Sequence, residues 1–209
     1  MRKLKNIKKK SMRTTIILLF ITLSVFSQNE MNFGVKIGAN YSRPFNNSVG
    51  DPFGINLGFY GEKNLNNEIS IIGEVLYNNK KSGGSKVIKH HGYLSSDLTI
   101  IDHGYIDFSI LFNYKLLKKF SINIGPEIGF LISHNDSYTL SNGPSPSTTT
   151  AIHSDEINKI DLNIDAGFNY YFNSDFFINT RYSYGLSNIL KNSDYKNGII
   201  SLSLNYKFK

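Results

Sequence analysis

Apolar and polar residues alternate with a period of two through most of the sequence after residue 32, and this pattern constrains the fold more than any other feature. At its start, Val35, Ile37 and Ala39 fall on one face, while Lys36 and Asn40 fall on the other. Because successive side chains of a β-strand point to opposite faces, the alternation predicts strands with one apolar face. Eight such segments follow one another, at residues 33–42, 53–60, 69–78, 106–114, 120–132, 160–172, 176–184 and 200–208.

The connections between these segments alternate strictly between short and long. The short ones are residues 63–68, 115–119 and 173–175, and the long ones are residues 43–52, 79–103, 134–159 and 187–197. Strands of about 9–11 residues, joined by short periplasmic turns and longer external loops, are typical of outer-membrane barrels. Backbone groups that face lipid must be paired within the protein, so the first strand must pair with the last. The predicted fold class is all-β, an eight-stranded antiparallel up-and-down transmembrane β-barrel.

Most aromatic residues of the apolar face collect near the strand ends, where the two interfaces of a bilayer would lie. Phe120 and Phe172 lie at the end with the short connections, and Tyr41 and Tyr182 at the other. A secreted soluble β-barrel or sandwich with its apolar face inward is the alternative. The opposite face argues against it, because that face is rich in Gly, Asn, Ser and charge, whereas the inside of a small soluble barrel needs bulky residues.

One segment departs from the alternation. In residues 69–78, Ile72 and Leu76 fall on the polar face beside Glu74. The face of this segment that should be polar is therefore mixed.

Residues 1–27 have the pattern of a secretory signal peptide, which export would remove. Basic residues precede an apolar run at residues 16–26, and small Ser27 offers a cleavage point before Gln28. The run has 11 residues, whereas a membrane-spanning helix needs about 20. We therefore expect residues 28–209 to form the mature outer-membrane β-barrel domain.

Removal of the signal peptide changes the charge of the protein. The signal holds seven of the 23 Lys and Arg residues and no acidic residue, which leaves 16 basic and 16 acidic residues. A neutral chain lacks the basic surface that a nucleic-acid partner requires. The absence of cysteine excludes disulfides and thiolate metal sites. Met12 offers a second start codon that would leave the mature protein unchanged.

Three short sequence motifs follow one another along the chain in an order that is shared with a known family. They are Gly-Pro-Glu-Ile-Gly-Phe at residues 125–130, Arg-Tyr-Ser-Tyr-Gly-Leu-Ser-Asn-Ile at residues 181–189, and the closing segment 201–208, which ends in Tyr-Lys-Phe. Together they resemble the outer-membrane β-barrel domain of the "porin family protein" and PorT-like group, over essentially the whole mature chain. The resemblance implies an eight-stranded barrel in the outer membrane, in contact with outer-membrane lipid and mostly without an assigned activity.

The end of the chain carries a second implication of this resemblance. Tyr206 and Phe208 resemble the terminal aromatic insertion signal that the barrel-insertion machinery reads. Lys209 follows Phe208, which departs from the strict form of that signal.

The polar face of the predicted strands carries nine charged residues, at Lys36, Glu62, Glu74, Asp107, Glu127, Asp161, Asp165, Arg181 and Lys207. An eight-stranded barrel is only wide enough for side chains to fill it, so these charges should meet. If the short turn near Leu117 sets the register, Glu127 lies opposite Asp107. The short turn around Ser174 likewise puts Arg181 within a diagonal step of Asp165. We predict that Arg181 bridges Asp107, Glu127 and Asp165. The predicted lumen charge network is Asp107, Glu127, Asp165, Arg181, Glu74 and Lys36.

This network has a structural interpretation and a catalytic alternative. As a satisfied polar network it would hold the barrel rigid. A paired-carboxylate hydrolase would need a substrate cavity, which a filled barrel lacks. We therefore predict no catalytic residues.

All five histidines fall in or beside the two longest predicted loops, at His90, His91, His103, His134 and His153. A zinc or copper site is the alternative to solvated histidines, but two adjacent histidines on a strand cannot easily bind one ion. We predict no metal and no cofactor. The low-complexity loop at residues 142–150 offers a contact surface for a receptor, a phage or another cell.

The function predicted from these features is a structural or surface-binding scaffold and not an enzyme. Its long external loops would contact a surface ligand or an envelope protein. The alternatives are a small-solute pore, which needs an open lumen, a component of an envelope secretion assembly, and a loop-based membrane enzyme, which would depend on residues such as His103 and His134.

Overall fold

The computed structural model of the protein describes residues 31–42, 53–90, 93–135, 137–142, 148–151, 157–191, 194 and 196–208, with side chains except in residues 82–101 and 137–151. Among the described residues, no helix is long and apolar enough to cross a membrane. The described strands are β1 (Met31–Ser42), β2 (Phe53–Asn64), β3 (Ile69–His90), β4 (Tyr93–Leu117), β5 (Phe120–His134), β6 (Ser137–Asn142), β7 (Thr148–Ala151), β8 (Ile160–Tyr171), β9 (Phe176–Asn188) and β10 (Lys196–Lys207).

Eight of these strands close into an antiparallel barrel. Around the ring the order is β1, β2, β3, β4, β5, β8, β9 and β10. The last strand returns to the first, where Ala39 pairs with Leu202 and Val35 with Tyr206. The closed ring leaves no free edge in the part of the wall that crosses the bilayer. The predicted eight-stranded up-and-down barrel is confirmed.

The barrel wall is apolar outside and polar inside. On the outer face, Ile37, Phe59 and Ile110 are each about two-thirds exposed, at 64%, 65% and 65%. Their inward-facing neighbours include Lys36, which is 3% exposed. Soluble proteins rarely expose so large an apolar surface, whereas lipid requires it. The soluble alternative is wrong, because the apolar face does not point inward.

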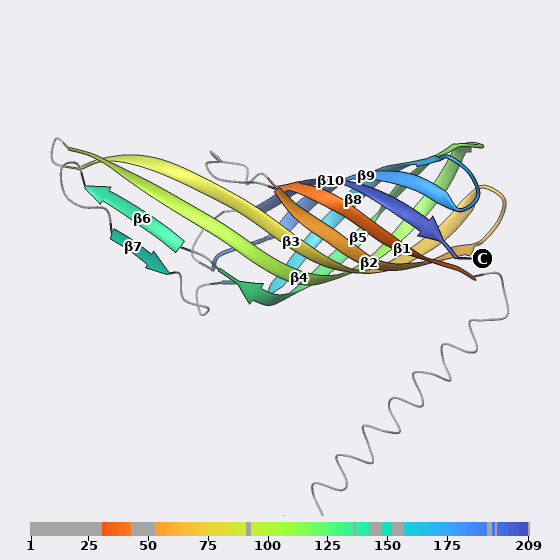
Figure 1. Ribbon diagram of the computed structural model, residues 1–209, viewed down its shortest axis with the longest axis horizontal. Helices are drawn as coiled ribbons and strands as arrows, with labels where there is room; N and C mark the ends of the chain where they lie inside the picture. The colour runs from red at the N-terminus through yellow and green to blue at the C-terminus, as the bar shows by residue number, and fades with distance from the viewer. Residues whose placement is uncertain are drawn as a thin grey trace, which may run out of the picture. The chain divides into compact units, whose positions relative to one another are not determined.

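The two ends of the barrel differ, and we name them by their connections. The turn rim carries the β2–β3, β4–β5 and β8–β9 turns together with the end of β10, and the loop rim lies at the opposite end of the barrel (Figure 1). Asn66 Oδ1 accepts hydrogen bonds from the backbone N–H of Glu68 and Ile69, at 2.9 and 2.8 Å. Asn173 makes the same arrangement in the β8–β9 turn. These asparagine turns explain why both reversals are tight.

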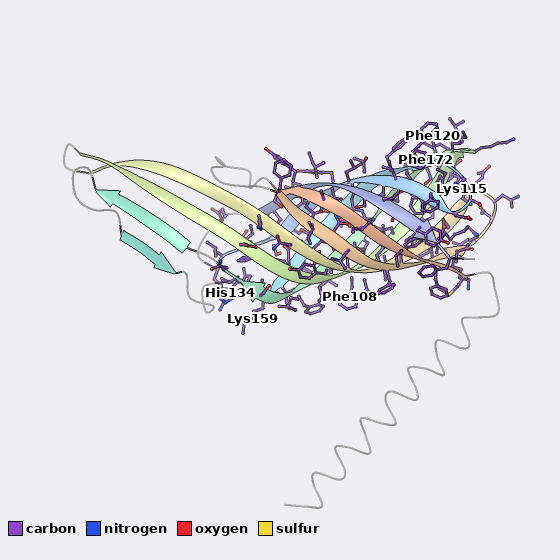
Figure 2. All side chains as sticks on the ribbon, viewed as in Figure 1. Phe108, Lys115, Phe120, His134, Lys159 and Phe172 are labelled. Carbon is purple, nitrogen blue, oxygen red and sulfur yellow. The ribbon has the colours of Figure 1, made fainter. Side chains whose placement is uncertain are left out.

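Aromatic rings pack against one another near both rims. At the turn rim the Phe120 and Tyr170 ring centroids lie 5.1 Å apart, and those of Phe176 and Tyr206 lie 4.8 Å apart. Figure 2 shows Phe120 and Phe172 at this end and Phe108 on the outer face closer to the middle of the barrel. Rings that are partly polar or polarisable suit the boundary between lipid and water.

Two of the predicted external loops are wrong in part, because they contain strands. β3 and β4 continue as a paired hairpin from Asn79 and Gly104 to His90 and Tyr93. β6 pairs with β4 beyond the barrel, and β7 pairs with β6. We call this extension, formed by β6, β7 and residues 82–90 and 93–101, the protruding sheet (Figure 1). Beyond the bilayer no lipid-facing side is needed, so hydropathy does not alternate there and the strands escape prediction.

A charged lumen as the candidate functional site

Lys80 of β3 lies at the centre of one group of buried charges. Its Nζ lies 3.0 Å from Asp107 Oδ2, 3.3 Å from Glu127 Oε1 and 2.9 Å from Asp161 Oδ2. The three carboxylates come from β4, β5 and β8, and all four side chains are at most 3% exposed. We call these four residues the Lys80 cluster. An ammonium group has three N–H donors, so Lys80 can contact one carboxylate on each of the three strands.

Arg181 of β9 organises a second group. Its Nη1 and Nη2 donate to the two carboxylate oxygens of Glu74 at 2.6 and 2.9 Å, and Nη1 also lies 3.3 Å from Asp165 Oδ2. Lys36 Nζ approaches Glu74 Oε1 at 3.1 Å. We call Arg181, Glu74, Asp165 and Lys36 the Arg181 cluster. A two-pronged guanidinium–carboxylate contact is both stronger and more directional than a single hydrogen bond.

Strand periodicity explains why these side chains meet. Glu74 and Lys80 are both even-numbered residues of β3, and Asp161 and Asp165 are both odd-numbered residues of β8, so each pair shares the inner face of its strand. Gly129 of β5 stands opposite Asp107. A Cβ at this position would collide with Asp107 Oδ1, so the glycine makes room for the carboxylate.

The lumen charges form two clusters where the sequence analysis predicted one. Arg181 lies diagonal to Asp165, as expected, since it pairs with Gly167 while Asp165 pairs with Ser183. Glu127 does not lie opposite Asp107; it pairs with Ser109, and that expectation is wrong. The cation beside Asp107 and Glu127 is Lys80, whereas the carboxylates that contact Arg181 are Glu74 and Asp165.

Lys80 and Asp161 are the site residues that the predicted network lacked. Lys80 falls in a predicted external loop, although it continues the even-numbered inward series of Glu74 and Asn78 along β3. That parity is the signal that could have found it. Asp161 stood on the predicted polar face without an assigned partner.

Buried amides connect the charges to the rest of the lumen. Asn56 donates to Asn40 at 2.6 Å, Asn40 to Asn78 at 2.9 Å, and Asn78 to Asp107 at 2.5 Å. Toward the turn rim a second chain runs from Asn179 through Asn169, Asn113 and Ser70 to Glu62. Buried charges and amides are tolerated when their hydrogen bonds are made, and these chains make many of them.

An apolar layer crosses the lumen beside the Arg181 cluster. Tyr60, Ile72, Leu111 and Phe177 are buried together, with Tyr171 packed against them. The Tyr60 and Phe177 rings meet edge to face, with centroids 5.7 Å apart. Ile72, which breaks the sequence alternation, belongs to this layer. In the middle of the lumen, Lys36, Lys80 and Arg181 border a cavity of about 10 Å³, roughly the space of a single water molecule.

Other candidate residues lie apart from both clusters. His103 is buried, with its Nδ1 3.2 Å from the Tyr105 hydroxyl oxygen, while His134 is exposed. The side chain of His90 and the whole of His91 and His153 lie outside the described residues. Within the described part of the chain, no group of three or more His, Asp or Glu side chains could hold a metal ion.

Solved structures with a similar fold share little sequence identity with this chain. The attachment invasion locus protein Ail of Yersinia pestis is 18% identical, with 86% of this chain and 99% of that chain covered and a TM-score of 0.49. The Neisserial surface protein A (NspA) is 13% identical, with 86% and 100% covered and a TM-score of 0.47. No protein with a curated description matches the chain by sequence.

The model of one protein family matches residues 26–191, which is more than half of the chain. This match ends before β10, while the barrel itself closes through that strand. The protein is located in the outer membrane, as the family description and the lipid-facing wall both indicate. The chain belongs to the outer membrane protein beta-barrel domain family.

Proposed function

We propose that the protein is a closed outer-membrane scaffold whose protruding sheet binds an extended segment of a partner outside the cell. The observation that carries this proposal is the backbone edge of β3. β2 pairs with β3 from Ser70 to Asn78, whereas β3 continues beside β4 to His90. Among the described strands, none pairs with the other side of β3 over residues 82–90.

An edge of this length can accept another strand. At about 3.3 Å per residue, the nine residues 82–90 span roughly 30 Å. Unpaired N–H and C=O groups along such an edge recruit extended peptides by adding them as a further strand. The opposite border of the protruding sheet, β7, offers a second and shorter edge of four residues. Both edges lie beyond the loop rim, which faces the cell exterior in barrels of this kind.

The packing of the lumen supports a scaffold over the small-solute pore. The Lys80 cluster, the Arg181 cluster and the apolar layer all occupy the same narrow interior. Eight-stranded barrels have an interior that side chains fill. A conducting pathway would require these groups to separate, which would leave buried charges without partners.

Binding is tested with a library of synthetic twelve-residue peptides on purified protein in lipid nanodiscs. We expect some peptides to bind the native protein and to lose binding when alternate residues are N-methylated, because N-methylation removes strand hydrogen bonds. A trimmed variant, with residues 82–101 replaced by Asn-Gly between the paired residues Lys81 and Asp102, should bind none of them. Equal binding by the trimmed variant would refute the proposal.

The small-solute pore and the secretion-assembly component have separate tests. In planar bilayers we expect no stepwise conductance, and steady single-channel currents would favour the pore instead. A role in an envelope secretion assembly predicts that other envelope proteins co-purify with the native protein and equally well with the trimmed variant. Loss of that co-purification on trimming would place the contact on the protruding sheet.

A further inference from the structure

A cavity of about 410 Å³ opens at the turn rim and is distinct from the charged lumen clusters. Its lining includes four lysines, Lys115, Lys118, Lys119 and Lys207, and a single acidic residue, Glu62. Ligand pockets in proteins range from about 300 to 1,000 Å³, so this one has the size for a few amino-acid residues. The excess of ammonium groups selects for an anionic ligand.

The position of the cavity decides where its ligand comes from. The lining residues belong to β2, β4, β8 and β10 and to the β4–β5 and β8–β9 turns. Those four strands alternate with the other four around the ring, so the cavity lies within the mouth of the barrel and not on its lipid-facing side. Figure 2 shows Lys115 at this end, opposite the end that carries His134 and Lys159. A ligand therefore enters along the barrel axis from the periplasm, toward which the short turns point.

The walls of the cavity add polar and aromatic groups to the charges. Tyr171 stacks on Phe177 of the apolar layer, with ring centroids 5.0 Å apart, and its hydroxyl lies 3.3 Å from Ser121 Oγ. The apolar layer thus forms a floor that stops a ligand from passing further. Glu62 is 6% exposed and accepts a hydrogen bond from Ser70. Its second oxygen can accept from an N–H group, which peptides carry and phosphate ions do not.

We propose that this turn-rim cavity binds an acidic peptide segment of a periplasmic partner. The lysines pair with the carboxylates of the peptide, and amide and hydroxyl groups of Asn64, Asn173 and Ser174 meet its backbone. Lys118 and Lys119 are exposed residues of the β4–β5 turn. Their ammonium groups are therefore available to a ligand without loss of a buried contact.

The test is calorimetric titration of acetylated hexaglutamate into the folded full-length mature protein in a zwitterionic detergent. We expect saturable binding that becomes about tenfold weaker in the double variant Lys118→Gln/Lys119→Gln, since each exposed ion pair contributes up to about fivefold. Hexalysine should give no saturable heat. Resistance of the folded band to heating before electrophoresis verifies that the variants retain the barrel.

A matched control separates the cavity from general charge attraction. Lys159→Gln/Lys191→Gln removes the same two charges from exposed residues outside the cavity lining. This control should bind hexaglutamate as the native protein does, and an equal loss in both double variants would overturn the proposal. Two further outcomes would also overturn it. One is displacement of hexaglutamate by anionic phospholipid in mixed micelles, which would identify a lipid headgroup as the ligand; the other is displacement by millimolar inorganic phosphate.

Discussion

Replacement of Lys80 by methionine tests whether the Lys80 cluster stabilises the barrel. The methionine keeps most of the length of the side chain but removes the ammonium group that lies within 3.3 Å of three buried carboxylates. Removing one partner of a buried ion pair costs about 3–5 kcal/mol, because the remaining charge is left uncompensated. Two of the carboxylates keep a hydrogen-bond donor, because Asn78 still donates to Asp107 and Asn163 still donates to Glu127. We therefore expect a loss of about 3 kcal/mol in the free energy of unfolding.

The measurement is urea unfolding in lipid vesicles, followed by the heat-dependent gel shift and by circular dichroism, because the chain has no tryptophan for fluorescence. The neighbouring Lys81 supplies the control. Its side chain is 36% exposed and lies 3.7 Å from Asp102, so Lys81→Met should change stability by less than about 1 kcal/mol. In the double variant Lys80→Met/Asp161→Asn, removal of one uncompensated carboxylate should restore part of the loss.

The reasoning is refuted if Lys80→Met unfolds at the same urea concentration as Lys81→Met. That result would mean that water or conformational relaxation replaces the ammonium group at no cost. A loss without any recovery in the double variant would show instead that the lysine acts through packing of its aliphatic stem, including its position 4.7 Å from the Tyr105 ring centroid.

Four shorter predictions follow from other contacts. Arg181→Met should lower the free energy of unfolding by about 3 kcal/mol in the same urea assay, because Glu74 and Asp165 lose a shared partner. Gly129→Ala should cost about 1–3 kcal/mol, because its Cβ collides with Asp107 Oδ1; unchanged stability would contradict this. Phe208→Ala should reduce the amount of protein in the membrane fraction if the last aromatic residue serves as an insertion signal. Mass spectrometry of the protein extracted from membranes should find an N-terminus at Gln28, and an intact residue 1 would contradict removal of the signal peptide.

The part of the fold that crosses the bilayer could be predicted, and the part beyond it could not. Lipid requires apolar outward residues in the middle of each strand, as from Phe33 to Tyr41 of β1, from Phe53 to Phe59 of β2 and from Ile200 to Tyr206 of β10, and this leaves a period of two in the sequence. The protruding sheet has water around it, so no face of its strands must be apolar. The alternation therefore predicts a loop at the threonine-rich strand β7, although β-branched residues favour strands.

Predicting which charged side chains contact one another requires the register between neighbouring strands, and the register was only partly predictable. The expected pairing of Glu127 with Asp107 assumed that the β4–β5 turn centres on Leu117. The strands instead reverse at Lys118–Lys119, with an irregularity between Lys115 and Leu117. Moving the centre of a turn by one residue moves each cross-strand partner by two, which keeps every side chain on its face but changes its neighbour. Faces were thus predictable from hydropathy, while partners depended on the exact turn.

The Arg181–Glu74 pair has a mechanical consequence for the protruding sheet. In the ring of eight strands, β9 and β3 are separated by three strands on either side, so this pair joins opposite walls of the barrel. Backbone hydrogen bonds couple only adjacent strands, and they cannot by themselves resist flattening of the ring. β3 also carries the edge that no described strand covers and that we propose binds a partner. Lys80 fixes the same strand to β4, β5 and β8 just where it leaves the barrel. The two clusters therefore hold the base of the protruding sheet in one position, which lowers the conformational entropy that binding along its edge would cost.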